Sequence, residues 1–182
     1  MYYCGLDFAT KGSMAQIGSE GPSGGSSEGL VRLYEWKPMR RRSGTVIRLV
    51  ERVSGSVHEF NTLAEMGAHI AQDMEAPSRM VVEDQHVSPR NVRTGLRLAR
   101  GCGLVLSHIL VRQIGEGVPA SDVAQFLNPS AWRRAYWGPS KRLSRDEWKQ
   151  RAIVEAHKLT GLKLGDDSSE AVLMAIVCQK LV

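Results

Sequence analysis

The chain has 182 residues, of which 42% are hydrophobic and 24% charged, and a formal net charge of +5. This length fits one domain with a single core, and the composition is too apolar for general disorder. The longest apolar runs are too short to cross a bilayer, and the N-terminus lacks the basic start and apolar stretch of a secretory signal, so we expect a cytoplasmic protein. A basic protein attracts nucleic acid or anionic lipid alike.

Four extended runs, rich in β-forming side chains, precede residue 60. We expect them to pair with one another as the antiparallel portion of a sheet. Residues 19–29 consist almost entirely of Gly, Ser, Pro and Glu, which is typical of a flexible loop. A basic tract at 37–44 separates the third run from the fourth. The four runs cover residues 2–8, 13–19, 30–36 and 45–53.

Helical patterns alternate with further strands after residue 60. Leu63, Met66, Ile70 and Met74 recur at spacings of three and four behind Thr62, which predicts a capped helix. Strands followed by helices, after an antiparallel start, indicate an α/β fold with a mixed sheet. The later segments are a strand at 79–85, a helix over 88–113, a strand at 120–129, a Ser-capped helix over 144–161 and a last helix from near Asp167.

Cysteine chemistry is not indicated. Cys4, Cys102 and Cys178 lie far apart and are odd in number, which argues against a disulfide framework and against a CxxC metal site. We expect each to be a small buried apolar residue.

Carboxylates occur at three points where they need an explanation. Asp7 and Glu83 fall in apolar strand segments, where an acid is disfavoured unless it has a partner or a function. Asp167 and Glu170 are three residues apart, so one face of the last helix carries both. The alternative is structural: acids at a helix start cap it and complement its dipole, and strand acids can be satisfied by backbone or arginine groups. Asp166 would lie at or before the first turn.

The order of these motifs resembles the RuvC family of Holliday junction resolvases, within the ribonuclease H-like superfamily. The first-strand acid of that family is matched by "GLD" at 5–7, the middle strand and long helix by "VVEDQHV" and "LRLARGCGLVLS", and the final acid pair by "DSSEAVLMAI". The resemblance spans nearly the whole chain. It implies one nuclease domain over 1–182, with a ribonuclease H-like, mixed five-stranded sheet whose first strands are antiparallel and whose faces are flanked by helices. The acids that it assigns to catalysis and metal binding are Asp7, Glu83, Asp167 and Glu170.

Three departures from the family pattern are visible. The first acid is followed by Phe8 rather than Pro-Gly, the last acid is Glu170 where Asp or His is usual, and the segment 19–60 is longer. They are typical of a divergent member, and a phage-encoded protein acting in the host cytoplasm is one interpretation.

The resemblance implies hydrolysis of phosphodiester bonds in four-way junctions with Mg²⁺ or Mn²⁺, two ions per site. Two hard cations about 4 Å apart can deprotonate a water and neutralise the leaving oxygen, and Mg²⁺ takes oxygen ligands. Without metal, clustered acids repel one another and some of their pKa values rise. Symmetric paired incisions require two active sites, which a homodimer supplies. The long helix after the middle strand is the expected interface, with a core role as the alternative.

Basic residues accumulate between His86 and Lys158, where 13 Lys or Arg compare with 5 Asp or Glu. Residues 130–151 mix these cations with aromatic side chains, so phosphate contact and base stacking are both available. The alternative is a solvated basic surface with tryptophans in the core, which we favour for Trp148. The residues predicted to bind nucleic acid are Lys11, Arg40, Arg41, Arg42, Arg90, Arg93, Arg133, Arg134, Lys141 and Arg142.

Two other functions fit the same residues. One is a ribonuclease H-like nuclease that acts on RNA–DNA hybrids or on single-stranded DNA, and its substrate preference would distinguish it. The other is a non-catalytic protein that binds branched DNA, in which the acids only cap and pair. A membrane-surface protein is not favoured, because its cations would follow one amphipathic helix.

Overall fold

The computed structural model describes residues 1–9, 11–22, 29–84, 92–139 and 143–181. In this part of the chain, seven strands form one sheet and six helices pack around it. The strands are β1 (Tyr2–Asp7), β2 (Gly12–Ile17), β3 (Leu30–Arg41), β4 (Gly44–Glu51), β5 (Val57–Phe60), β6 (Ser78–Glu83) and β7 (Ala124–Leu127). The helices are α1 (Leu63–Asp73), α2 (Val92–Gly115), α3 (Ala120–Val123), α4 (Pro129–Trp137), α5 (Arg145–Thr160) and α6 (Asp166–Lys180).

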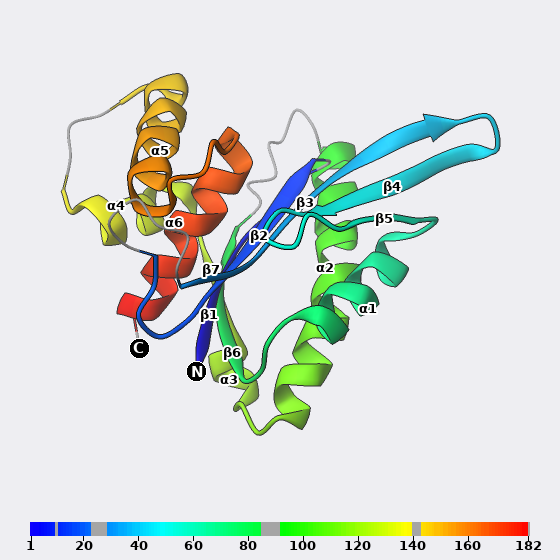
Figure 1. The fold of residues 1–182 in the computed structure, drawn as a ribbon, viewed down its shortest axis with the longest axis horizontal. Helices are drawn as coiled ribbons and strands as arrows, with labels where there is room; N and C mark the ends of the chain where they lie inside the picture. The colour runs from blue at the N-terminus through cyan, green and yellow to red at the C-terminus, as the bar shows by residue number, and fades with distance from the viewer. Residues whose placement is uncertain (10, 23–28, 85–91, 140–142, 182) are drawn as a thin grey trace.

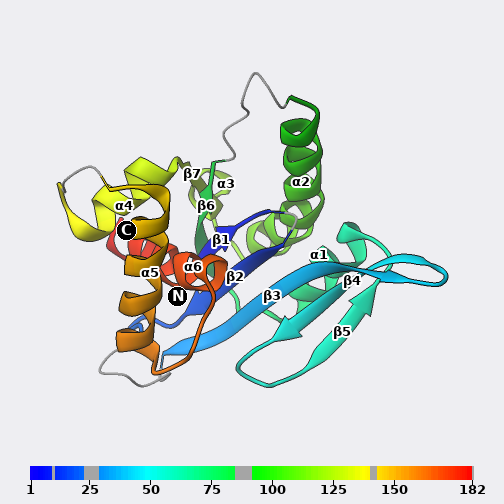
Figure 2. The same ribbon diagram turned by 90° about the horizontal axis from the view of Figure 1, so that it is seen from above.

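Helices cover both faces of the sheet, whose strand order is β5-β4-β3-β2-β1-β6-β7. The helices α1 and α2 lie on one face, and α4, α5 and α6 lie on the other (Figures 1 and 2). Leu6, Met14 and Val105 belong to the core on the first face, while Ala15 and Val172 belong to the core on the second. The three-layer α/β arrangement predicted from the sequence is therefore confirmed.

The sheet changes from antiparallel to parallel at β1. Strands β1 to β5 pair antiparallel with their sequence neighbours, whereas β6 pairs parallel with β1 and β7 parallel with β6. Leu6 is in register with Val82, and each is followed by an acid that ends its strand, Asp7 on β1 and Glu83 on β6. Because parallel strands end at the same edge, the two acids lie at one edge of the sheet.

Helix α6 packs closely against β1, and Gly5 permits the contact. A Cβ at Gly5 would lie 2.1 Å from the Ala171 carbonyl oxygen and 2.5 Å from the Ala175 nitrogen, which is far inside contact distance. Nearly every residue of α6 from Ser168 to Cys178 is buried, so the helix lies in the core rather than along its surface. This packing fixes where the first turn of α6 presents its acids.

The predicted helix starts are confirmed where the structure describes them. Thr62 with Glu65 and Ser144 with Glu147 each form a capping box, in which side chain and backbone bond reciprocally. Helix α6 begins at Asp166, after Gly165, which has no side chain to cap it. The predicted helix start at residue 88 and loop residues 23–28 lie outside the described residues.

Three details of the prediction are wrong. The sheet has seven strands rather than five, because β5 and β7 add a four-residue edge strand at either end. Of these two, only β5 lies outside the extended segments predicted from the sequence, and its residues are half-buried or exposed. The segment 120–129 is not a single strand: Pro119 precedes the helical turn α3, and only 124–127 is extended. Helix α4 was not predicted, although Asn128 caps it and Pro129 occupies its first turn.

All three cysteines are free and buried, as expected from their spacing. Among the described helices, none has the length and apolar character needed to span a membrane.

Candidate functional site

The four acids singled out in the sequence line one pocket of about 290 Å³. Asp7 ends β1, Glu83 ends β6, and Asp167 and Glu170 occupy the first turns of α6. The fold thus brings together residues that are as far apart in the chain as Asp7 and Glu170. The same pocket is lined by three cations from α4 and α5, namely Arg133, Arg145 and Lys149.

Burial, together with the crowding of carboxylates, raises the pKa of three of the acids. Burial and the neighbouring carboxylates Glu83, Asp167 and Glu170 raise the pKa of Asp7 from its ordinary value of 3.8 to about 8, against a lowering effect of Lys149. Burial also raises the pKa of Glu83 and of Asp167. Asp7 is only 6% exposed, so little water reaches its charge. A cation bound in the pocket would favour the charged form of all three.

Helix α4 holds two of the acids through consecutive residues. The indole Nε1 of Trp132 donates to Glu83 Oε2 at 2.9 Å, and this bond opposes the rise in the pKa of Glu83. Arg133 Nη2 lies 2.6 Å from Glu170 Oε1, and both side chains are largely buried. Two sequence signals mark the start of α4, namely the capping residue Asn128 and Pro129 in the first turn.

Asp166 has a separate role from Asp167. Lys149 of α5 forms an ion pair with Asp166, and this contact, with backbone N–H groups of Asp166 and Asp167, holds the pKa of Asp166 below its ordinary value. Asp166 therefore has the structural role considered as the alternative, in which an acid at a helix start interacts with the free backbone N–H groups there. Asp167 remains free to face the acidic pocket.

The donor set of the pocket fits Mg²⁺ or Mn²⁺. Its four acids offer only carboxylate oxygens, which hard divalent cations prefer, and the raised pKa of Asp7 indicates a place that favours added positive charge. In the described part of the chain, no three His, Cys, Asp or Glu side chains already stand together as ligands of one ion. Two of the acids are instead engaged by Trp132 and Arg133. The residues that would hold a metal are Asp7, Glu83, Asp167 and Glu170.

The residues predicted to bind DNA fall into three groups. Lys11 lines a groove shared with Asp167, and Arg133 lines the acidic pocket beside exposed Arg134. Arg93 is exposed on α2. The tip of the β3–β4 hairpin carries exposed Arg40, Arg41 and Arg42 and projects away from α4, α5 and α6 (Figure 1), and Arg41 pairs there with Glu59. Arg90, Lys141 and Arg142 lie outside the described residues.

The aromatic side chains of α4 and α5 pack with one another. Trp132 is fully buried, so it cannot stack on a base, and stacking by that residue is excluded. Half-buried Trp137 and Trp148 lie 5.2 Å apart between ring centroids, and Arg151 lies over both rings. The packing role favoured for Trp148 agrees with these contacts.

The arrangement of sheet and helices has a counterpart among solved structures. The Thermus thermophilus RuvC structure is 17% identical and superposes with a TM-score of 0.52, covering 97% of this chain and 92% of that one. The chain has a RuvC-like fold. A T. thermophilus RuvC in complex with Holliday junction substrate is 13% identical, with a TM-score of 0.47 and the same two coverages.

The RuvC-like fold confirms, at the level of architecture, the resemblance noted in the sequence. No protein-family model and no curated protein matches the chain. The functions of the individual residues therefore rest on the geometry and chemistry of the site.

Proposed function

We propose that the chain is a metal-dependent, structure-selective endonuclease that hydrolyses phosphodiester bonds in Holliday junctions or other branched DNA by symmetric paired incisions. The observation that carries this proposal is the common pocket of Asp7, Glu83, Asp167 and Glu170 at one edge of a RuvC-like sheet. Cations from α4 and α5 line the same pocket, which suits a polyanionic substrate.

Each part of the pocket has a task in this hydrolysis. Bound Mg²⁺ or Mn²⁺ supplies an activated water and neutralises charge at the leaving oxygen. Asp7 and Glu83 offer oxygen ligands from two rigid strands, and Trp132 holds the Glu83 carboxylate in orientation. Arg145 and Lys149 supply positive charge for the substrate phosphate. Burial of Asp7 keeps competing water away from its carboxylate.

We further propose that the active form is a homodimer that associates through α2. The solvent face of this helix carries large apolar side chains, and isolated globular domains rarely leave such a stripe uncovered. Two-fold association would give the two sites that paired incision requires. The apolar residues and their exposed fractions are Val92 47%, Leu96 63%, Leu104 41%, Val111 73% and Ile114 49%.

A substrate panel tests the proposed function. The full chain is incubated with four-way, forked and linear DNA, single-stranded DNA and an RNA–DNA hybrid, each with Mg²⁺, Mn²⁺ or EDTA. We expect preferred cutting of the four-way or forked DNA, lost with EDTA. Cutting of the hybrid or single strand, with no preference for junctions, would instead establish the ribonuclease H-like alternative. Junction binding without cutting under any metal would establish a non-catalytic binding protein.

A further inference from the structure

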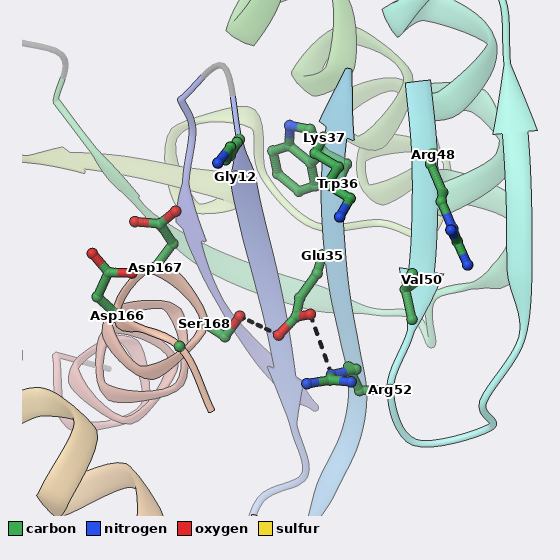
Figure 3. Close-up of a pocket in the computed structure, with 12 residues that line it drawn as sticks. Gly12, Glu35, Trp36, Lys37, Arg48, Val50, Arg52, Asp166, Asp167 and Ser168 are labelled. Atoms are coloured by element: carbon green, nitrogen blue, oxygen red, sulfur yellow. Dashed lines mark hydrogen bonds and ion pairs between the residues drawn. The ribbon is translucent and has the colours of Figure 1, made fainter. Parts of the chain in front are cut away.

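A second groove, of about 480 Å³, lies next to the acidic pocket and shares Asp167 with it. Its floor is the face of β2, β3 and β4 that looks toward the first turn of α6 (Figure 3). Lys37 of β3 and Arg48 of β4 line this groove together with Lys11. Nothing in the proposed hydrolysis uses Lys37 or Arg48.

The strand register gathers these three cations. Lys37 and Arg48 are direct cross-strand partners, and Gly12 is in register with Trp36, which puts Lys11 beside Lys37. Like charges directly opposite each other destabilise a sheet unless an anion compensates them. Among the described residues, none of the three has an ion-pair partner. Arg48 Nε is also shielded from solvent and lacks a hydrogen-bond partner in that part of the chain.

The acids of the groove do not neutralise this cluster. Glu35 accepts a hydrogen bond from Ser168 Oγ at 2.6 Å and pairs with Arg52 Nε at 3.2 Å (Figure 3). Asp166 is paired with Lys149 on α5. Asp167 also lines the acidic pocket, where the proposed metals would meet it. Within the described part of the chain, the groove therefore keeps three positive charges without an ion pair next to the proposed cleavage site, although Lys11 is close enough to lower the pKa of Asp167.

We propose that this groove binds the sugar-phosphate backbone of the substrate strand on one side of the scissile bond, with Lys11, Lys37 and Arg48 contacting successive phosphates. The inference rests on the proposed nuclease function and extends its substrate path. Three neighbouring strands span about 10 Å, since strands lie about 4.8 Å apart. At about 3.4 Å of axial rise per nucleotide, three successive phosphates span about 7 Å along the helix axis, and the long, flexible Lys and Arg side chains can adjust to that spacing. The bond from Ser168 to Glu35 joins the groove floor to the turn that carries Asp167.

Salt-dependent binding tests this path. Junction affinity is measured from 50 to 300 mM salt, in Ca²⁺ to prevent cutting, for the wild-type chain and for Lys37→Gln/Arg48→Gln. Log affinity falls linearly with log salt, and each lost phosphate contact should reduce the magnitude of this slope by about 0.7–0.9. The slope of the double variant should therefore be smaller in magnitude by about 1.4–1.8 than that of the wild type. The control is Lys158→Gln/Lys163→Gln, which removes the same amount of charge from two exposed positions. Lys158 lies in the last turn of α5, and Lys163 follows that helix. The slope of the control should stay as in the wild type.

Neutral methylphosphonates then locate the contacts. Placed within three nucleotides of the scissile bond, on the side that leads into the groove, they should weaken binding of the wild-type chain roughly tenfold. They should weaken binding of the double variant clearly less, because only its Lys11 contact remains to be lost. Equal slopes for the double variant and the control would contradict the proposal that the groove binds phosphates. Equal effects of the methylphosphonates on the wild type and the double variant would also contradict it. The proposed function is judged separately, since a wild-type chain that cuts junctions with Mg²⁺ retains that function whatever the slopes show.

Discussion

Arg133 and Glu170 form an ion pair of 2.6 Å in which the side chains are only 16% and 5% exposed. Arg133 belongs to helix α4, which the sequence pattern did not predict, and Glu170 is one of the acids proposed to bind metal. A bound divalent cation would compete with Arg133 for the Glu170 carboxylate. The pair therefore connects the stability of the metal-free protein with the occupancy of the proposed site.

Removing the cation of this pair should destabilise the metal-free chain. Arg133→Ala leaves the buried Glu170 charge uncompensated, at an expected cost of about 3 kcal/mol in the free energy of unfolding by urea. Arg134→Ala, on the exposed side of the same helix, should change that free energy by less than about 0.5 kcal/mol. Added Mg²⁺ should restore part of the loss, because it supplies positive charge near Glu170. Equal stability of the two variants in EDTA would show that the pair contributes nothing.

Trp132 should act as a positioning residue for Glu83. Trp132→Phe keeps an aromatic ring in the core but removes the indole donor that stabilises the charged carboxylate. The pKa of Glu83, already raised by burial, should rise further, so the acid limb of the cleavage profile should move to higher pH. The measurement is the cleavage rate from pH 5 to pH 9 at saturating Mg²⁺. If the pH profile and the cleavage rate of the variant equal those of the wild type, Trp132 does not position Glu83 for catalysis.

Ionisation of the buried Asp7 carboxyl should lower the free energy of unfolding of the metal-free protein as the pH rises. The folded pKa of Asp7, about 8, exceeds its ordinary value of 3.8, so between these values the folded chain binds the proton that the unfolded chain has released. Stability from this group is therefore complete below about pH 4 and is lost as the pH rises toward 8. Asp7→Asn should be more stable than wild type at pH 8 in EDTA, by roughly 2–5 kcal/mol, and nearly equal to it at pH 4.

Urea unfolding of both proteins at the two pH values checks this expectation. Saturating Mg²⁺ at pH 8 should reduce the difference, because the cation stabilises the Asp7 carboxylate of the wild type only. A variant that is less stable than wild type at pH 8 in EDTA would mean that Asp7 is compensated by groups other than a metal.

The exposed apolar face of α2 should control association. Val111→Asp introduces charge at a side chain that is 73% exposed, so the fold should tolerate it while a dimer contact should not. Sedimentation velocity should show a dimer for the wild type and a monomer for the variant, and the two incisions of a junction should become uncoupled. Val154→Asp makes the same change on α5, at 51% exposure, and should leave the mass unchanged. Identical masses for all three proteins would exclude α2 as the interface.

Local pattern and residue type were enough to predict the parts of the fold with strong signals. The apolar runs within β1, β3 and β6 are largely buried, as their composition predicted. The capping residues of α1 and α5 form the predicted capping boxes. The acids could be grouped because two of them end neighbouring strands and two begin a helix. Edge strand β5 was not predicted, since four half-exposed residues leave little hydrophobic periodicity, and β7 was predicted within a segment that was too long.

Contacts made by tertiary packing were beyond prediction from local pattern. Ser168 and Glu35 are 133 residues apart, and no periodicity in either segment indicates their hydrogen bond. Trp132 looked available for base stacking because it sits among arginines, yet the fold buries it against the acidic site. The cations Arg145 and Lys149 were likewise not singled out, because their proximity to the acids depends on how α5 packs on α6.

Cleavage of a four-way junction by carboxamide variants tests the central claim most directly. Asp7→Asn and Glu83→Gln keep the shape of each side chain but remove a metal-binding charge. With Mg²⁺, we expect both to lose roughly 10³-fold or more of the wild-type cleavage rate while binding the junction with affinity within a few-fold of wild type. Cleavage by either variant at the wild-type rate, or a wild-type chain that cuts no nucleic acid with Mg²⁺ or Mn²⁺, would contradict the account.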